Sequence, residues 1–184
     1  DRNFELADGG YENTALGFYN LFSSQNNNHT IAIGYNNLNN AENGNTNIAI
    51  GEGNLDGMLT GGENNIGIGN YNLSYECNNI NYNIGIGFDN MRTAINCNNN
   101  IAIGGNLLMP GFNNASYNIA IGFSSTFNNI AMDCIFIGHN ATATSGPYIN
   151  RIAIGYNANC VDDYSVQIGE NTNSGNNGYL KFRS

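Results

Sequence analysis

With 184 residues, 41% of them apolar, the chain is long enough for one domain with a real interior. Five Lys and Arg residues stand against fourteen Asp and Glu residues, and the resulting net charge of −9 would repel a phosphate backbone, so we expect no nucleic-acid partner. No segment approaches the roughly 20 apolar residues of a membrane span, so we expect no membrane insertion, and the wealth of Asn and Gly predicts almost no helix.

Residues 1–12 predict an entering strand and turn, and residues 13–172 carry a repeat of the form Ile, small residue, Ile, Gly. Successive copies lie 14 to 18 residues apart when each is anchored on its glycine: Gly17, Gly34, Gly51, Gly69, Gly87, Gly104, Gly122, Gly138, Gly155 and Gly169. A period near 17 with one short alternating segment per copy is typical of a solenoid. We therefore predict an all-β fold, a parallel β-solenoid of about ten turns of 17–18 residues.

The alternation within each copy puts the two Ile side chains, such as Ile31 and Ile33, on one face of a strand. We expect these large side chains to form two columns inside the solenoid. The small residue between them would then point outward, and it is Ala15, Ala32, Ala49, Gly67, Gly85, Ala102, Ala120 or Ala153. We expect three chains to pack these small residues around a common axis, which would open or end near Phe136 and Gln167.

The anchor glycine ends each strand, at a corner that we expect to need positive φ or close backbone approach. Asn recurs three residues after the glycine and four before it, where it tolerates left-handed turns and can stack into amide ladders. The residue after the first Asn predicts a third interior column: Leu21, Leu38, Leu55, Leu73, Met91 and Leu108. From Thr126 onward this column lapses, so the last turns should be narrower or differently filled.

The motif "NIAIGEGN", Asn47 to Asn54, resembles the repeat of trimeric autotransporter adhesin heads, a left-handed parallel β-roll in which three chains associate side by side. It also resembles the repeats of phage and large-virus tail fibres. The resemblance covers about Asn13 to Thr172, although the adhesin turn is shorter. It implies a homotrimer, surface exposure and adhesion, and no catalytic residues. Residues 173–184 predict a turn and an exit strand, so both ends fit a segment of a longer fibre.

Catalytic candidates are few. His29 and His139 lie about six turns apart, and neither is near a Ser or Cys in a nucleophile motif. Glu52, Asp56 and Glu63, or Asp162 and Asp163, are the carboxylates that could pair as in glycosidases, and the last two could help to bind calcium. Solvated turns carry such acids routinely. We therefore expect no enzyme activity, no cofactor and no metal.

The residue directly after the glycine is aromatic in half of the copies: Phe18, Tyr35, Phe88, Phe123 and Tyr156. Such a row of rings could stack on sugars, but we favour packing at subunit contacts. The four cysteines form no CxxC pair, so we expect free, partly buried thiols, with a disulfide between Cys77 and Cys97 as the first alternative.

These patterns together favour a structural and adhesive segment of an extracellular or virion fibre, located on a virion or cell surface. Its partners would be its own copies and surface glycans or a host receptor. One alternative is a fibre-borne glycan-degrading enzyme. Another is an ice-binding solenoid, which the lack of a regular outward Thr column disfavours.

Overall fold

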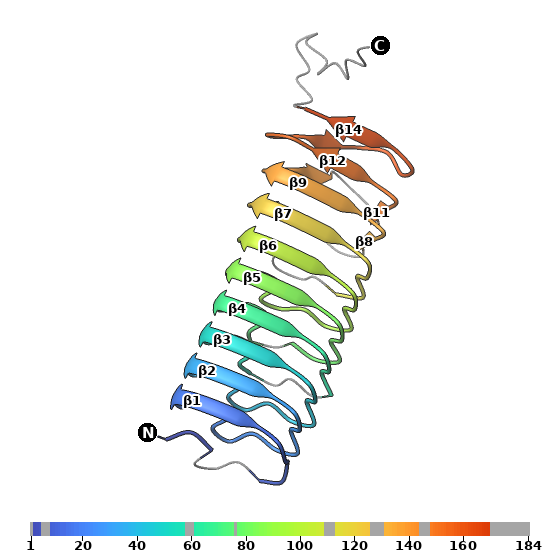
Figure 1. Ribbon diagram of the computed structural model, residues 1–184. Helices are drawn as coiled ribbons and strands as arrows, with labels where there is room; N and C mark the ends of the chain where they lie inside the picture. The colour runs from blue at the N-terminus through green and yellow to red at the C-terminus, as the bar shows by residue number, and fades with distance from the viewer. Residues whose placement is uncertain are drawn as a thin grey trace.

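The computed structural model describes residues 2–4, 8–57, 61–75, 77–108, 113–125, 131–143 and 148–169, and these residues form an all-β structure without helix (Figure 1). Ten strands stack in one parallel sheet along a rod: β1 (Thr14–Phe18), β2 (Ile31–Tyr35), β3 (Ile48–Glu52), β4 (Ile66–Asn70), β5 (Ile84–Phe88), β6 (Ile101–Gly105), β7 (Ile119–Phe123), β9 (Ile135–His139), β12 (Ile152–Ile154) and β14 (Val166–Ile168). Two short pairs lie outside this sheet: β8 (Ala131–Met132) with β11 (Tyr148–Ile149), and β10 (Thr142–Ala143) with β13 (Asn159–Cys160).

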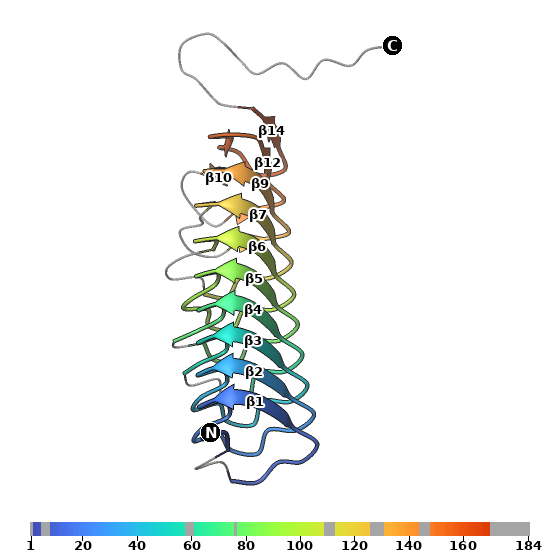
Figure 2. The same ribbon diagram turned by 60° about the vertical axis from the view of Figure 1, so that its left-hand side comes forward.

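The strands pair residue for residue, so that each repeat lies directly on the previous one. Gly34 of β2, for example, pairs with Gly17 on one side and Gly51 on the other. All strands of the main sheet point the same way, with the connections running around the rod (Figure 2). This confirms the predicted parallel β-solenoid. About eight turns are regular, and the count of ten stays a prediction because β12 and β14 have only three residues each.

The anchor glycines occupy corners that no other residue fits. Gly34 has φ +124°, and a Cβ there would lie 2.1 Å from the carbonyl oxygen of Gly51 in the next turn. The predicted positive φ and close backbone approach are therefore both confirmed.

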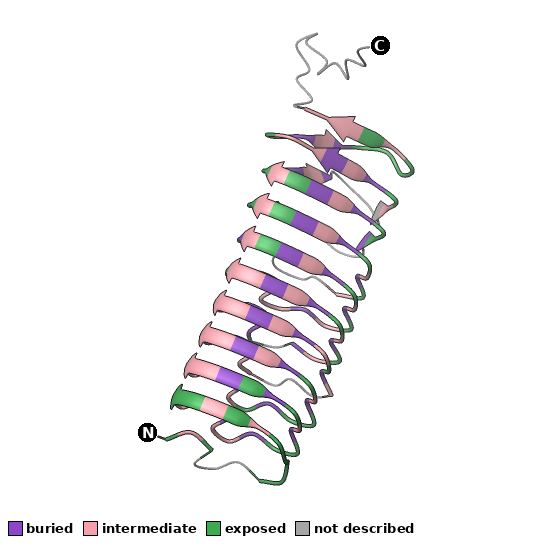
Figure 3. Ribbon diagram, in the orientation of Figure 1, coloured by how far each residue is buried: buried purple, intermediate pink, exposed green. Residues whose placement is uncertain are grey.

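The predicted orientation of the strands is wrong. Ala32, Ala49 and Ala102 are completely buried, whereas Ile31 and Ile103 expose 37% and 38% of their surface. Figure 3 shows the same pattern along the rod, with a buried residue in the middle of the strands and more exposed residues beside it. The small residues thus point into the solenoid, and the isoleucines point out of it.

The corner asparagines explain this inversion. Asn54 bends back against the sheet, where its Nδ2 donates hydrogen bonds to the carbonyl oxygens of Ile50 in β3 (3.1 Å) and of Gly69 in β4 (2.6 Å). Its Cβ would lie 3.0 Å from a Cβ added at Gly67, the inner residue of the next strand, and Leu55 Cγ would lie 3.5 Å away. The space facing the strand is already filled, so only Gly or Ala fits there.

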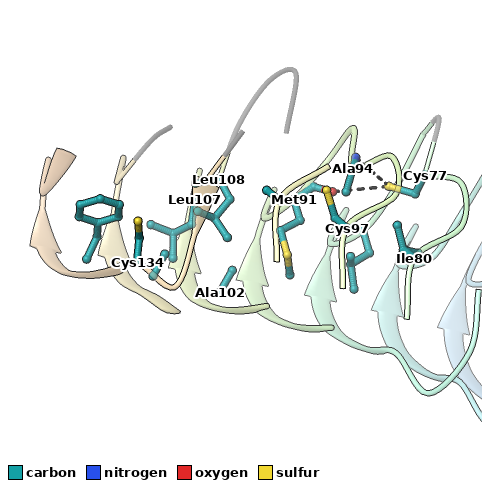
Figure 4. Packing of buried hydrophobic residues seen from close by; sticks show 14 of the residues in the cluster. Cys77, Ile80, Met91, Ala94, Cys97, Ala102, Leu107, Leu108 and Cys134 are labelled. Carbon is teal, nitrogen blue, oxygen red and sulfur yellow. Dashed lines mark hydrogen bonds between the residues drawn. The ribbon is translucent and has the colours of Figure 1, made fainter. Parts of the chain in front are cut away.

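The third interior column lies where the sequence predicts it. Leu21, Leu38, Leu55, Leu73, Met91 and Leu108 are all completely buried. In Figure 4, Ala102 projects from β6 toward the side chains of Leu107 and Leu108. The core is therefore a thin layer between the inner methyl groups of the sheet and this column.

The last turns are differently filled, as predicted, because the column of large residues lapses there. Phe136 is on the inner face of β9, in register with Ala120 and Ala153, and it is completely buried. The corner that follows β9 offers only Ala141 and Thr142 where earlier turns have Asn and Leu. Phe136 thus fills the core rather than marking an opening between chains, and Gln167, in β14, is half-buried.

The asparagines are structural, as predicted, and they form two buried ladders. In the first, Asn37, Asn54, Asn72 and Asn90 each donate from Nδ2 to Oδ1 of the Asn one turn before, at 2.8–3.1 Å. In the second, Asn65, Asn83, Asn100 and Asn118 do the same at 3.0–3.2 Å. The first ladder extends back to Asn3, whose Oδ1 accepts from Asn20 at 3.2 Å. The predicted exit strand within 173–184 lies outside the described residues.

Candidate interaction surface

The outward face of the sheet carries two columns that are apolar except at Thr14, and we call them the isoleucine face. One column is the third residue before each anchor glycine: Thr14, Ile31, Ile48, Ile66, Ile84, Ile101, Ile119, Ile135, Ile152 and Val166. The other is the residue directly before it: Leu16, Ile33, Ile50, Ile68, Ile86, Ile103, Ile121, Ile137, Ile154 and Ile168. None of these positions is charged, and all are half-exposed or exposed. The rod therefore presents a continuous apolar strip.

A third column borders this strip where the strands end, and we call it the rim column. It is the residue directly after each glycine: Phe18, Tyr35, Glu52, Asn70, Phe88, Gly105, Phe123, His139 and Tyr156. Its aromatic residues are exposed, from 38% at Phe18 to 62% at Tyr156. The predicted row of rings is thus present, interrupted by polar residues and by one glycine.

Rings of neighbouring turns stack on each other. Phe18 and Tyr35 are parallel within 2° at a centroid distance of 6.1 Å. His139 stacks between Phe123 (5.7 Å) and Tyr156 (5.4 Å). Because the faces of these rings cover one another, their edges point away from the stacks, which is a poor platform for a sugar. Sequence reasoning missed that His139 belongs to the row, although its place directly after Gly138 could have shown it.

A further column, exposed except at the half-buried Asn64, borders the isoleucine face where the strands begin, and we call it the start column. It is the residue five before each glycine: Glu12, His29, Thr46, Asn64, Tyr82, Asn99, Tyr117, Asp133, Asn150 and Tyr164. All ten have φ in the left-handed region. Tyr82 and Tyr117 expose 59% and 62% of their surface. Both edges of the isoleucine face therefore carry exposed side chains that differ from turn to turn.

The carboxylates that could have formed a catalytic pair have separate partners. Glu52 accepts a hydrogen bond from the Tyr71 hydroxyl (2.9 Å), which raises the pKa of Tyr71. Glu63 accepts from Asn45 Nδ2 at 3.1 Å. The interactions of the described residues do not join any two of these carboxylates.

Asp56 is the carboxylate that burial affects most. Desolvation raises its pKa to about 6, although hydrogen bonds from the Gly57 backbone and from Asn36 Nδ2 (2.7 Å) oppose the shift. Its pKa resembles that of a catalytic acid, but its partner is a structural amide.

Asp163 is held by an ion pair and a backbone hydrogen bond. It pairs with the buried Arg151 guanidinium at 2.7 Å, and the Ile149 N–H and Arg151 together lower its pKa. Arg151 stands in the position that buried asparagines hold in earlier turns. The predicted alternative of a calcium site at Asp162 and Asp163 thus competes with an ion pair for the second carboxylate.

The two histidines lie far apart, as predicted. His29 precedes β2, where its Nδ1 lies 2.9 Å from Glu12 Oε2, and His139 ends β9 further along the rod (Figure 1). Among the described residues, no three His, Cys, Asp or Glu side chains gather as they would around a metal ion.

The four cysteines are buried, and none of them forms a disulfide. Cys77 Sγ accepts the Ala94 N–H at 3.4 Å and contacts the Met91 carbonyl oxygen at 3.5 Å (Figure 4). Cys97 belongs to another column, the one that holds Ile80 and Ala115, as the pairing of Asn81 with Asn98 shows. Cys77 therefore stacks against Ala94 rather than Cys97, and the disulfide alternative is wrong.

These features define the class of molecule: a parallel β-solenoid rod with one uncharged apolar face and two variable borders. The described part of the chain contains no long apolar helix of the kind that crosses a bilayer. No protein-family model matches the chain, and no curated protein is significantly similar to it.

Proposed function

We propose that this chain is a structural and adhesive segment of an extracellular or virion fibre, and that three copies associate through the isoleucine face. The observation that carries the proposal is the exposure of that face. Soluble monomers rarely expose apolar patches larger than a few hundred Å². Ten rows about 4.8 Å apart, and the two isoleucine columns together with the rim column, which span about 15 Å, give roughly 700 Å².

That area is close to the roughly 800 Å² which each partner buries in a standard protein interface. The occupant we propose is another copy of this chain, for two reasons. The face is uncharged, so a strongly charged partner would gain little there. Its rows also repeat at the strand spacing of the rod, which only another parallel solenoid matches row by row.

The number three comes from the resemblance to adhesin heads, because a flat strip could also close a dimer. The proposed adhesion also rests on the resemblance to adhesin heads. In this proposal the isoleucine face is covered, and the polar turns on the other sides of the rod remain free to contact surface glycans or a host receptor. None of the described features favours the glycan-degrading enzyme or the ice-binding solenoid.

Light scattering tests the assembly. The native chain should have three times the mass of its 19.8 kDa monomer. Ile103→Glu should abolish the trimer, whether the released monomers stay folded or unfold. Ile95→Glu is the matched control, since Ile95 pairs with Asn78 and Asn113 on a turn, away from the isoleucine face. A monomeric native chain, or an unchanged trimer of the Ile103 variant, would contradict the proposed interface.

Adhesion needs its own measurement. The trimer should bind host cells or a glycan array and leave the glycans intact. Release of sugar fragments would support the enzyme instead, and thermal hysteresis would support ice binding. A trimer that binds neither cells nor glycans would show that the segment only projects other parts of the fibre.

A further inference from the structure

The isoleucine face leaves one question open, namely what fixes the axial register between copies. Its rows are nearly identical, so sliding one chain by a whole turn places Ile against Ile again. The rim column and the start column, which border this face, vary from turn to turn. These two columns lie at opposite ends of the strands (Figure 1). In a cyclic assembly, the rim column of one chain borders the start column of the next.

We infer that the two columns match row by row, so that the rim residue of each turn contacts the start residue of the same turn in the neighbouring chain. This inference rests on the proposed association of parallel copies. Its strongest support is the pairing of aromatic residues. Phe88 and Tyr82 belong to one turn, and Phe123 and Tyr117 to another. All four rings are 47–62% exposed, which is unusual for side chains of this size.

Polar rows match as well. His139 shares its turn with Asp133, and both are exposed, so contact between chains would join an imidazole to a carboxylate. Asn70 shares its turn with Asn64, which would pair two amides. Two rows depart from the rule, since Phe18 would meet Glu12 and Tyr156 would meet Asn150, and Gly105 has no side chain to match its start residue. Glu12 already pairs with His29 in its own chain.

The correlation has no explanation within one chain. The two columns are six residues apart, with an extended strand between them, so their side chains are separated by about 20 Å. A slip of one turn in either direction destroys the match. Phe123 would then face Asp133 or Asn99 instead of Tyr117, and Phe88 would face Asn99 or Asn64 instead of Tyr82. Such unlike contacts would favour the unshifted register.

Cross-linking between two introduced cysteines tests the axial register between neighbouring chains directly. The Phe123→Cys/Tyr117→Cys variant should form covalent dimers and trimers when treated with a short bis-maleimide. A link within one chain is excluded by the separation of about 20 Å. The native cysteines are buried and should not interfere. The matched controls, Phe123→Cys/Asp133→Cys and Phe123→Cys/Asn99→Cys, test a shift of one turn and should cross-link at least tenfold more slowly.

Light scattering on the same samples separates the two possible failures. Monomeric samples would overturn the proposed assembly and this inference with it. Assembled samples that cross-link equally well at all three pairs, or better at a shifted pair, would overturn the row matching alone. Fast cross-linking only at the unshifted pair is the result that supports it.

Discussion

Asn54 Oδ1 accepts two hydrogen bonds from Asn72 in the next turn, one from its backbone N–H (3.1 Å) and one from its Nδ2 (2.9 Å). Asn72 in turn donates from Nδ2 to the carbonyl oxygens of Ile68 and Gly87, both close to 3 Å away. A single buried amide therefore ties its own corner to both neighbouring turns. Stacking identical residues in this way gives the buried corner amide hydrogen-bond partners in its own turn and in both neighbouring turns.

Asn72→Asp should be severely destabilising. The carboxylate has no N–H to donate, so its oxygen would face the carbonyl oxygens of Ile68 and Gly87 in a buried site. We expect a loss of at least about 3 kcal/mol in the free energy of unfolding, measured by denaturant titration. The same change at the exposed Asn96, whose Nδ2 donates to Asn114 Oδ1, should cost about 0.5 kcal/mol or less. Equal losses at the two positions would mean that burial of the ladder does not determine the cost of the substitution.

Ala102→Leu tests which side of the strand is inside. Ala102 is completely buried, so a larger side chain should overpack the core and cost about 1–3 kcal/mol. Ile103→Leu places the same side chain on the adjacent outward position and should change the melting temperature little. An Ala102→Leu variant as stable as the parent chain would contradict the observed orientation.

The sequence predicted the strand in each repeat, the glycine corners and the buried Leu column correctly, because each depends on residues close together in the chain. It did not predict which strand face is inside. Alternation shows that Ile48 and Ile50 share a face, but the inward direction depends on contacts between turns. The deciding contact joins Asn54 to Gly67, thirteen residues later. A large apolar side chain was a misleading guide, because the corner asparagines already fill the space it would need.

The borders of the isoleucine face were only half predicted. The aromatic residues after the glycines were visible in the sequence, but the stacking of His139 and the start column were not. A comparison of residues six positions apart, such as Tyr117 and Phe123, would have shown the correlation. Its meaning required the structure, since only the fold places these two positions at opposite ends of one strand.

Phe136→Ala should be among the most damaging truncations in the chain. Phe136 belongs to the largest fully buried side chains, and it fills a core that only Ala141 and Thr142 could otherwise occupy at that corner. We expect the free energy of unfolding to fall by about 3–5 kcal/mol for Phe136→Ala and by less for Phe136→Leu. Thermal melting measures both losses. If both variants melted at the same temperature as the parent chain, the Phe136 ring would not contribute to the stability of the core near β9.

Asp56 should make the chain more stable at mildly acidic pH. Its folded pKa of about 6 lies above the ordinary carboxyl value, so between pH 6 and 4 the folded chain holds a proton that the unfolded chain has released. Stability therefore rises as the pH falls from 7 to 5. The stabilising pair of Asp163 with Arg151 acts in the opposite sense, but only below pH 4, because the pKa of Asp163 is lowered.

The measurement is the melting temperature at pH 5 and at pH 7, for the parent chain and for Asp56→Asn. The amide can still accept the hydrogen bond from Asn36, so the variant should melt higher at pH 7. The melting temperature of the variant should also differ much less between pH 5 and pH 7 than that of the parent chain. An unchanged difference would place the responsible group elsewhere.

The thiols should be silent toward a disulfide reagent until the chain unfolds. Burial raises the pKa of Cys77 to about 12 and that of Cys97 to about 11, so neither is a thiolate at pH 8. All four cysteines should react together in guanidinium chloride. Fast labelling of one thiol in the native protein would show that its turn opens locally.

The bonds between turns also determine how the rod responds to force. Hydrogen bonds from one turn to the next run along its long axis, so a pull on the two ends loads the turns in series. The load is equal at every turn, and the turn with the fewest bonds yields first. The corner Asn of the early turns is replaced by Leu107, Ser125, Ala141 and Ala158 further along. A stretched rod should therefore unfold one turn at a time from its C-terminal half. The N-terminal half, which holds the first asparagine ladder, should keep its length.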